Sequence, residues 1–375
     1  MKCKHETASR AAWARRAAAA GAVALAAVAA VVVALPAQAG TLADPLERPA
    51  LVVRQFERSA LLGLAQAGGR VVAVGEHGLV LLSDDGGAHW RQAATVPVSV
   101  TLTAVQFVGE RTGWAVGHQG VVLRSDDAGE HWTRQLEGRA VAALLLRDAQ
   151  SHGDAKAVAE AQRAVQEGAD KPLLALNFVN EHEGFVAGAF NLLLATRDGG
   201  RTWQAVSSRL PNPKGAHLYA IERDGAEVLL AGEQGLLLHS SDGGERFERI
   251  VTPYAGSFFV VTREANGAWL VAGLRGNVLR SADAGKSWTA LASPAPVSVT
   301  AALRDAQGGV WLANQAGQLL APAAGAATLR LVSPTSAQQP AGLLRLADGT
   351  LLIAGWNGVS RVDTRARNDK PTTTP

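Results

Sequence analysis

The chain has 375 residues, a formal net charge of +3, 47% hydrophobic residues, and a single cysteine. Its length suits one large β domain or two ordinary domains. Five basic residues and one glutamate lie within residues 1–39, so the remainder is close to neutral. This charge distribution gives no basis for nucleic-acid binding, and one cysteine cannot form an internal disulfide.

Residues 1–39 are typical of an export signal peptide. A basic region ends at Arg16, an apolar run covers 17–35, and Ala37 and Ala39 form a small-x-small cleavage pattern. The apolar run of 19 residues is also long enough for an uncleaved membrane anchor. We therefore expect an exported, periplasmic protein, with a linker over 40–48 before the folded domain.

An octapeptide of the form Ser/Thr-x-Asp-x-Gly-x-x-Trp, called an Asp-box, occurs four times, and a fifth copy ends in phenylalanine. The aspartate can accept hydrogen bonds from its own turn, and the glycine permits a positive φ. The aromatic ring can pack between neighbouring units. The residues predicted to stabilise these turns are Ser83, Asp85, Gly87, Trp90, Ser125, Asp127, Gly129, Trp132, Thr196, Asp198, Gly200, Trp203, Ser240, Asp242, Gly244, Phe247, Ser281, Asp283, Gly285 and Trp288.

A second pattern, two apolar strands joined by a short turn, occurs seven times along the chain. The glycine or asparagine markers of these turns are Gly78, Gly120, Asn191, Gly235, Gly276, Gly317 and Gly358. Repeats of about 40 residues with four short strands are typical of β-propeller blades. The sequence therefore predicts an all-β fold, a seven-bladed β-propeller over residues 49–363 with four-stranded blades and Asp-box turns.

The last repeat shows only three strands. We expect residues 51–58 to form the missing strand and to close the ring, which would remove an open sheet edge. The polar residues 364–375 are expected to be a disordered tail.

One interval, from Trp132 to Trp203, is about 29 residues longer than a normal repeat. The excess lies at about 139–172 and predicts a helical insertion between blades 2 and 3. Asp154 can cap one helix and Gly168 can end it, and 140–146 is a second helical candidate. The helix that Asp154 caps would carry Val158, Ala161 and Val165 on one side.

The turns between the second and third strands of each blade fall on the face opposite the Asp-boxes. The irregular segments also fall there, and the loops of a rigid scaffold commonly carry function. The residues expected to ring the central channel and to bind a partner are Glu76, His77, His118, Gln119, Phe190, Glu233, Gln234, Arg275, Trp356 and Asn357. Phe190, Arg275 and Trp356 are types that anchor protein interfaces, although some could simply plug the channel.

Catalysis is the alternative function. Glu76 and Glu233 occupy equivalent turns, so they could act as a carboxylate pair on a glycosidic bond. The two tyrosines, Tyr219 and Tyr254, lie in no recognisable nucleophile setting, and the histidines lack metal-ligand spacing. No catalytic residue, metal site or cofactor is therefore predicted.

The seven repeats behind an export signal resemble the Asp-box (BNR) propellers of the photosystem II stability/assembly factor family. The similarity covers about residues 50–363, and LTAVQFVGERTGWAVGHQGVVLRSDDAGEHW and GFVAGAFNLLLATRDGGRTW carry most of it. The resemblance implies a lumenal or periplasmic propeller that binds an assembling membrane-protein subunit through an arginine-rich surface. It therefore implies a non-catalytic scaffold whose partner is a membrane or envelope protein complex.

Overall fold

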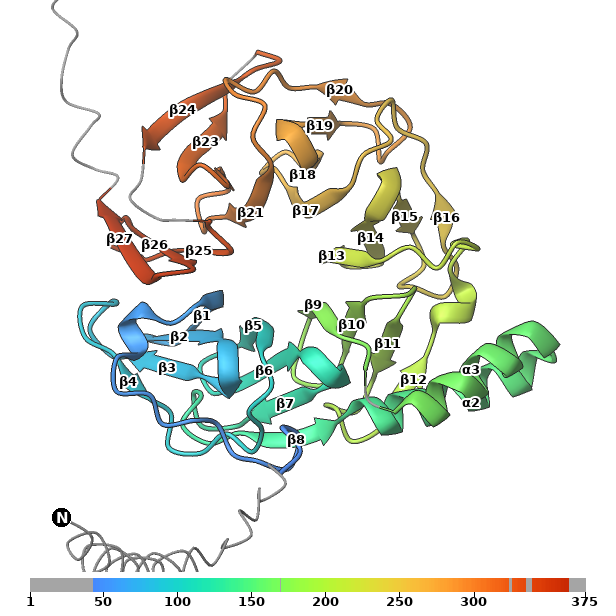
Figure 1. The fold of residues 1–375 in the computed structure, drawn as a ribbon. Coiled ribbons are helices and arrows are strands. Elements are labelled where there is room, and N and C mark those ends of the chain that lie inside the picture. Colours follow the sequence, from blue (N-terminus) through green and yellow to red (C-terminus); the bar gives the residue numbers. More distant parts are fainter. Residues whose placement is uncertain (1–42, 169, 324–325, 335–338, 364–375) are drawn as a thin grey trace, which may run out of the picture. The chain divides into compact units, whose positions relative to one another are not determined.

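The computed structural model describes residues 43–168, 170–323, 326–334 and 339–363. Within the unit that begins at Asp44, the described strands form seven antiparallel sheets arranged in a ring around a common axis (Figure 1). The predicted seven-bladed β-propeller is therefore confirmed. The expected signal peptide at 1–39 and the expected tail at 364–375 lie outside the described residues.

Six blades have four strands, numbered from the channel outward. Blade 1 contains β1 (Leu61–Ala67), β2 (Arg70–Gly75), β3 (Val80–Ser83) and β4 (Arg91–Gln92), and blade 2 contains β5 (Leu102–Val108), β6 (Thr112–Gly117), β7 (Val122–Ser125) and β8 (Thr133–Leu136). Blade 3 contains β9 (Leu173–Phe178), β10 (Gly184–Gly188), β11 (Leu193–Thr196) and β12 (Gln204–Ala205), and blade 4 contains β13 (Leu218–Asp224), β14 (Glu227–Gly232), β15 (Leu237–Ser240) and β16 (Glu248–Arg249). Blade 5 contains β17 (Phe258–Arg263), β18 (Trp269–Gly273), β19 (Val278–Ser281) and β20 (Thr289–Ala290), and blade 6 contains β21 (Val299–Arg304), β22 (Val310–Asn314), β23 (Gln318–Pro322) and β24 (Leu329–Pro334). Blade 7 contains β25 (Gly342–Arg345), β26 (Thr350–Gly355) and β27 (Gly358–Asp363).

The hydrophobic core is a ring of interfaces between neighbouring sheets. Because each sheet packs between two others, its middle strands are apolar on both faces, and β6 is buried along its whole length. Trp114 of β6 stacks on Phe178 of the next blade with ring centres 3.9 Å apart. Trp203 joins the same cluster, so blades 2 and 3 share one apolar layer.

The five Asp-boxes form one repeated turn between the third and fourth strands. In blade 2, the Ser125 hydroxyl donates to Asp127 and accepts from the backbone N–H of Gly129, both at 2.9 Å. Asp127 accepts from the N–H of His131 at 3.0 Å. The Trp132 indole donates to the Gly129 carbonyl at 2.9 Å and packs against blade 1. The box therefore fastens each blade to the preceding one.

The helical insertion between blades 2 and 3 is confirmed. It consists of α2 (Gly138–His152) and α3 (Ala155–Glu167), which run beside each other outward from the ring (Figure 1). The Asp154 side chain accepts hydrogen bonds at the start of α3, and Gly168 ends that helix, as predicted. The predicted apolar side is only partly right, because Ala161 and Ala164 are buried whereas Val165 is 45% exposed.

The strand predicted at 51–58 is wrong, and blade 7 has three strands among the described residues. The backbone N–H of Leu51 donates to the carbonyl of His77 at 3.3 Å, and that of Val53 donates to the Gln92 side chain at 2.9 Å. These donors are therefore used by blade 1 and are not available to β27.

A short 3-10 helix, η1 (Phe56–Arg58), seals the joint between blades 7 and 1 instead. Phe56 and Val359 pack against the same buried cluster, and the N–H of Gly358 donates to the carbonyl of Ser59 at 3.0 Å. The segment thus lies beside β27, as expected from the sequence, but as a turn.

The linker expected at 40–48 is packed onto the propeller from residue 44 onward. Leu46 is 1% exposed within the core of blades 1 and 2. Arg139 at the start of α2 pairs with Asp44 at 2.6 Å, and Arg48 donates to Ser99 at 2.9 Å. This segment is therefore a strap across two blades, because its one large apolar side chain is buried.

Candidate binding site at the channel mouth

The turns between the second and third strands hold side chains in an unusual backbone conformation. The φ angle lies between 53° and 58° at His77, Gln119, Phe190, Gln234 and Arg275. A left-handed conformation costs a residue with a Cβ roughly 1–2 kcal/mol, and such strain is concentrated at functional sites. Five blades therefore keep a side chain where glycine would be free of strain.

These turns share one face with the links that enter the following blades. The N–H of Asn191 donates to the Ala216 carbonyl at 3.3 Å, and the N–H of Arg275 donates to the Ser298 hydroxyl at 3.2 Å. Both acceptors belong to links before the next blade. The structure therefore brings turns and links together, as the chain order suggested.

The sequence-predicted ring residues differ in exposure. His77, His118, Phe190, Gln234, Arg275, Trp356 and Asn357 are exposed, whereas Glu76, Gln119 and Glu233 are partly buried. Phe190 and Trp356 are each 59% exposed. Neither aromatic ring is therefore buried as a plug.

The two glutamates of the alternative catalytic reading hold backbone groups of their own blades. Glu76 accepts from the N–H of Ala60 at 3.0 Å, and Glu233 accepts from the N–H of His217 at 3.3 Å. Each carboxylate thereby ties its turn to the start of the innermost strand. This arrangement gives both residues a structural task and does not favour a glycosidase pair.

A second set of residues, which was not predicted from the sequence, lies at the ends of the innermost strands and forms the floor of the channel mouth. The pairing of the two inner strands shifts register by one residue near the same end of the innermost strand in blades 1–6, which produces a β-bulge. The extra residues are Leu62, Thr103, Leu174, Tyr219, Phe259 and Thr300, all partly buried. Each of these residues precedes the glycine or asparagine that ends the second strand by a nearly constant number of residues. This spacing in the sequence could have identified them.

A cavity of about 290 Å³ connects this floor with two of the turns. It is lined by Leu62, Thr103, Thr300, Gln315, Gln339, Pro340, Ala341 and Trp356. The hydroxyl of Thr103 donates to the Leu173 carbonyl at 2.8 Å, and that of Thr300 donates to the Pro340 carbonyl at 2.6 Å. Because both hydroxyls donate to carbonyls of the neighbouring blade, the threonines present mainly their methyl groups to the cavity.

A row of aromatic rings runs along one side of the mouth from blade 3 to blade 5. Ring centres are 4.7 Å apart for Phe190 and His217, 6.2 Å for His217 and Tyr219, and 5.5 Å for Tyr219 and Phe259. The N–H of Phe190 donates to Nδ1 of His217 at 3.0 Å. Burial, and then the charge of Glu233, raises the pKa of the Tyr219 hydroxyl.

The sequence pattern of the photosynthesis system II assembly factor YCF48 family matches residues 65–141 and 155–319, more than half of the chain. This chain belongs to the YCF48 family. The photosystem II assembly lipoprotein Ycf48 of Synechococcus sp. (strain CC9902) is 34% identical over 91 residues, which is 24% of this chain and 27% of that relative. The match thus spans about a quarter of the relative's length.

Two solved structures show how widely the fold is shared. "YCF48 bound to D1 peptide" is 18% identical with a TM-score of 0.60, covering 83% of this chain and 97% of that chain. A streptogramin B lyase is 14% identical with a TM-score of 0.62, covering 85% and 98%. Since one of these proteins is a lyase, the propeller fold alone does not distinguish a binding protein from an enzyme.

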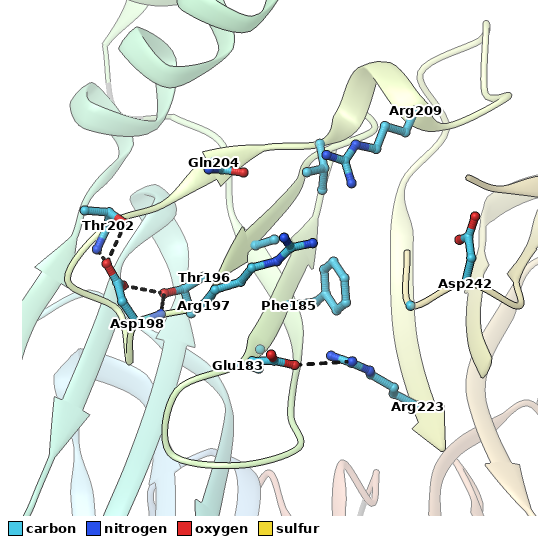
Figure 2. A pocket seen from close by; sticks show the side chains of 14 residues that line it. Glu183, Phe185, Thr196, Arg197, Asp198, Thr202, Gln204, Arg209, Arg223 and Asp242 are labelled. Atoms are coloured by element: carbon cyan, nitrogen blue, oxygen red, sulfur yellow. Dashed lines mark hydrogen bonds and ion pairs between the residues drawn. The ribbon is translucent and has the colours of Figure 1, made fainter. Parts of the chain in front are cut away.

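Three arginines of this YCF48-family chain gather in a groove on the Asp-box side between blades 3 and 4 (Figure 2). The groove has a volume of about 360 Å³ and is lined by Arg197, Arg209 and Arg223. Arg197 and Arg209 both pair with Glu245, and Arg223 lies 3.5 Å from Glu183. Each of the three guanidinium groups thus has a carboxylate partner within the protein.

One missing side chain explains this groove. In blade 2, Arg124 pairs across the sheet with Trp114, lies 5.3 Å from its ring centre, and donates to the Gly199 carbonyl at 2.6 Å. The equivalent pair in blade 3 is Phe185 and Ala195. The alanine leaves open the space that an arginine fills one blade earlier, so the groove requires no ligand to account for it.

Within the described residues, no three His, Cys, Asp or Glu side chains come together as metal ligands would. Nor is any helix of that part of the chain long and apolar enough to cross a membrane.

Proposed function

We propose that this chain is an exported, non-catalytic propeller that binds a segment of a membrane or envelope protein complex during assembly. Membership of the YCF48 assembly-factor family supports this function. A solved YCF48 bound to a D1 peptide supports a polypeptide ligand. The exposure of Phe190 and Trp356 at the channel mouth is the observation that carries the site assignment.

The proposed binding residues are those that surround the mouth. They are Glu76, His77, His118, Gln119, Phe190, Glu233, Gln234, Arg275, Trp356 and Asn357. Exposed aromatic and arginine side chains dominate the energy of protein interfaces, so Phe190, Arg275 and Trp356 are assigned the main contacts. The partly buried glutamates and Gln119 are assigned to shaping the turns.

The proposed location is the periplasm. Residues 1–39 have the composition of an export signal, and the matched Synechococcus relative is named a lipoprotein. A partner in the membrane or the envelope is therefore accessible to the folded domain.

Affinity capture from detergent-solubilised membranes of the native host tests this function. The tagged full chain should recover a defined membrane-protein complex, and Trp356→Ala with Arg275→Asn should reduce the recovery by at least about tenfold. Asparagine tolerates the left-handed conformation, so the second change removes the guanidinium with little strain. Glu248→Gln on the outer strand β16 is the matched control, and equal recovery by all variants would rule out this site.

A further inference from the structure

We infer that the channel mouth recognises an extended polypeptide segment with apolar side chains at alternate positions. This inference rests on the proposed function and specifies the chemistry of the bound segment. It follows from the spacing, orientation and charge of the aromatic row formed by Phe190, His217, Tyr219 and Phe259.

The spacing of the row fits an extended chain. Neighbouring ring centres are 4.7, 6.2 and 5.5 Å apart, and the rings come from three successive blades. An extended polypeptide places alternate side chains on one side about 6–7 Å apart. Successive same-side residues of a bound segment can therefore each contact a different ring.

The orientation of the rings favours side chains over sugars. The planes of neighbouring rings are inclined by 75°, 88° and 60°, so no two of them form a flat platform. Rings that meet edge to face leave notches between them that accept aliphatic or aromatic side chains.

The charge of the mouth favours uncharged side chains. Leu62, Leu174 and Ala341 lie near the same end of their innermost strands as Tyr219 and are partly buried beside the channel. The carboxylate of Glu233 lies 4.0 Å from Nδ1 of His217, within the row. The Lys171 ammonium lies 6.0 Å from the ring centre of Phe190 in the same row, so the row has no excess of one charge, whereas an apolar segment gains from covering half-buried carbon.

The row is also held in place. Phe190 keeps a positive φ of 55°, and its N–H is bound by the His217 ring that it contacts. The exposed ring is thereby oriented before any partner arrives, which lowers the ordering cost of binding.

Fluorescence anisotropy with three synthetic nonapeptides tests the inference. The first alternates serine with leucine or phenylalanine, the second has the same composition with its apolar residues grouped together, and the third has aspartate at the apolar positions. We expect the alternating peptide to bind at least about tenfold more tightly than the other two. Phe190→Asn and Tyr219→Ser should each weaken its binding by about tenfold, while Glu248→Gln on the outer strand β16 should not.

Each of the following results would contradict one part of this inference. Equal binding of the grouped peptide, or no peptide binding at all, contradicts the alternating pattern. Tighter binding of the acidic peptide that Arg275→Asn abolishes keeps the mouth as the site but overturns its apolar assignment. Competition by cello-oligosaccharides would replace the polypeptide with a glycan. Binding that is insensitive to Phe190→Asn, Tyr219→Ser and Trp356→Ala alike would refute the proposed site itself.

Discussion

Arg209 donates a hydrogen bond to the carbonyl oxygen of Gly244 at 3.1 Å, in the place that an indole N–H takes in the other four Asp-boxes. In those boxes the tryptophan donates to its own glycine at 2.9–3.2 Å. Phe247 has no N–H, so an arginine from the 3-10 helix η4 (Ser207–Arg209) supplies the missing donor. The Asp-box of blade 4 is thus completed by an arginine from the link before that blade.

This relationship predicts a rescue. Arg209→Ala should lower the free energy of unfolding by about 1–2 kcal/mol, because the Gly244 carbonyl loses its donor. Phe247→Trp in the same background should restore part of the loss by supplying an indole N–H. Urea denaturation measures both, and Arg197→Ala, which removes the other partner of Glu245, should change stability by less than about 0.5 kcal/mol. Equal losses for Arg209→Ala and Arg197→Ala would show that only the ion pairs count.

The innermost strand of blade 4 contains a pH-dependent element. Burial raises the pKa of Glu222 to about 7, against the lowering effect of Arg304 and Arg263. The folded state holds this proton more tightly than the unfolded state does. The contribution of the proton to stability is therefore complete below about pH 4.5 and is lost as the pH rises through 7. Glu222→Gln should therefore be more stable than the wild type at pH 8, by about 1–3 kcal/mol.

Thermal unfolding of both proteins from pH 5 to pH 8.5 measures the effect of Glu222. The two melting temperatures should converge at the acidic end, where the wild-type carboxyl is protonated. A difference between the two melting temperatures that is constant across this pH range would contradict the titration of Glu222.

The Asp-box of blade 3 should show the opposite pH dependence. The Thr202 hydroxyl donates to Asp198 at 2.6 Å, and this bond together with the Thr202 N–H lowers the pKa of Asp198 to about 2. The stabilisation that these hydrogen bonds give the folded state is present above the ordinary pKa of 3.8 and is lost as the pH falls toward 2. Thr202→Val should therefore lower the melting temperature at pH 7, and the deficit should shrink by pH 2.5. Arg201→Gln should change the pH dependence less than Thr202→Val, because Arg201 donates to the Asp198 backbone carbonyl and acts on the carboxylate only through its charge.

The strap before blade 1 should contribute to the stability of the whole ring. Leu46→Ala should cost about 2–5 kcal/mol, since Leu46 is 1% exposed in the core shared by blades 1 and 2. Val52→Ala, at a residue that is 92% exposed in the segment that follows the strap, should change stability by no more than about 0.5 kcal/mol. Urea denaturation of the two variants compares them, and a small loss for Leu46→Ala would mean that the strap is only loosely held.

Local patterns were sufficient for the blades and the helical insertion. Each Asp-box turn closes within eight residues, so the bonds among Ser125, Asp127 and Gly129 follow from the octapeptide itself. The caps of α3 at Asp154 and Gly168 are equally local. The failed strand at 51–58 shows the limit, because Leu51 and Val53 form backbone hydrogen bonds with residues of blade 1.

The sequence by itself determined the repeat, the number of blades, the position of the insertion and the turns that surround the mouth, because all of these depend on residues close together in the chain. Only the tertiary structure decided how the ring is closed, which turn residues are exposed, and that Phe190, His217, Tyr219 and Phe259 form one row. These four residues lie in three blades, and their contacts arise from the β-bulges and the packing of neighbouring sheets. No local pattern specifies such contacts, since each one depends on where the next blade lies.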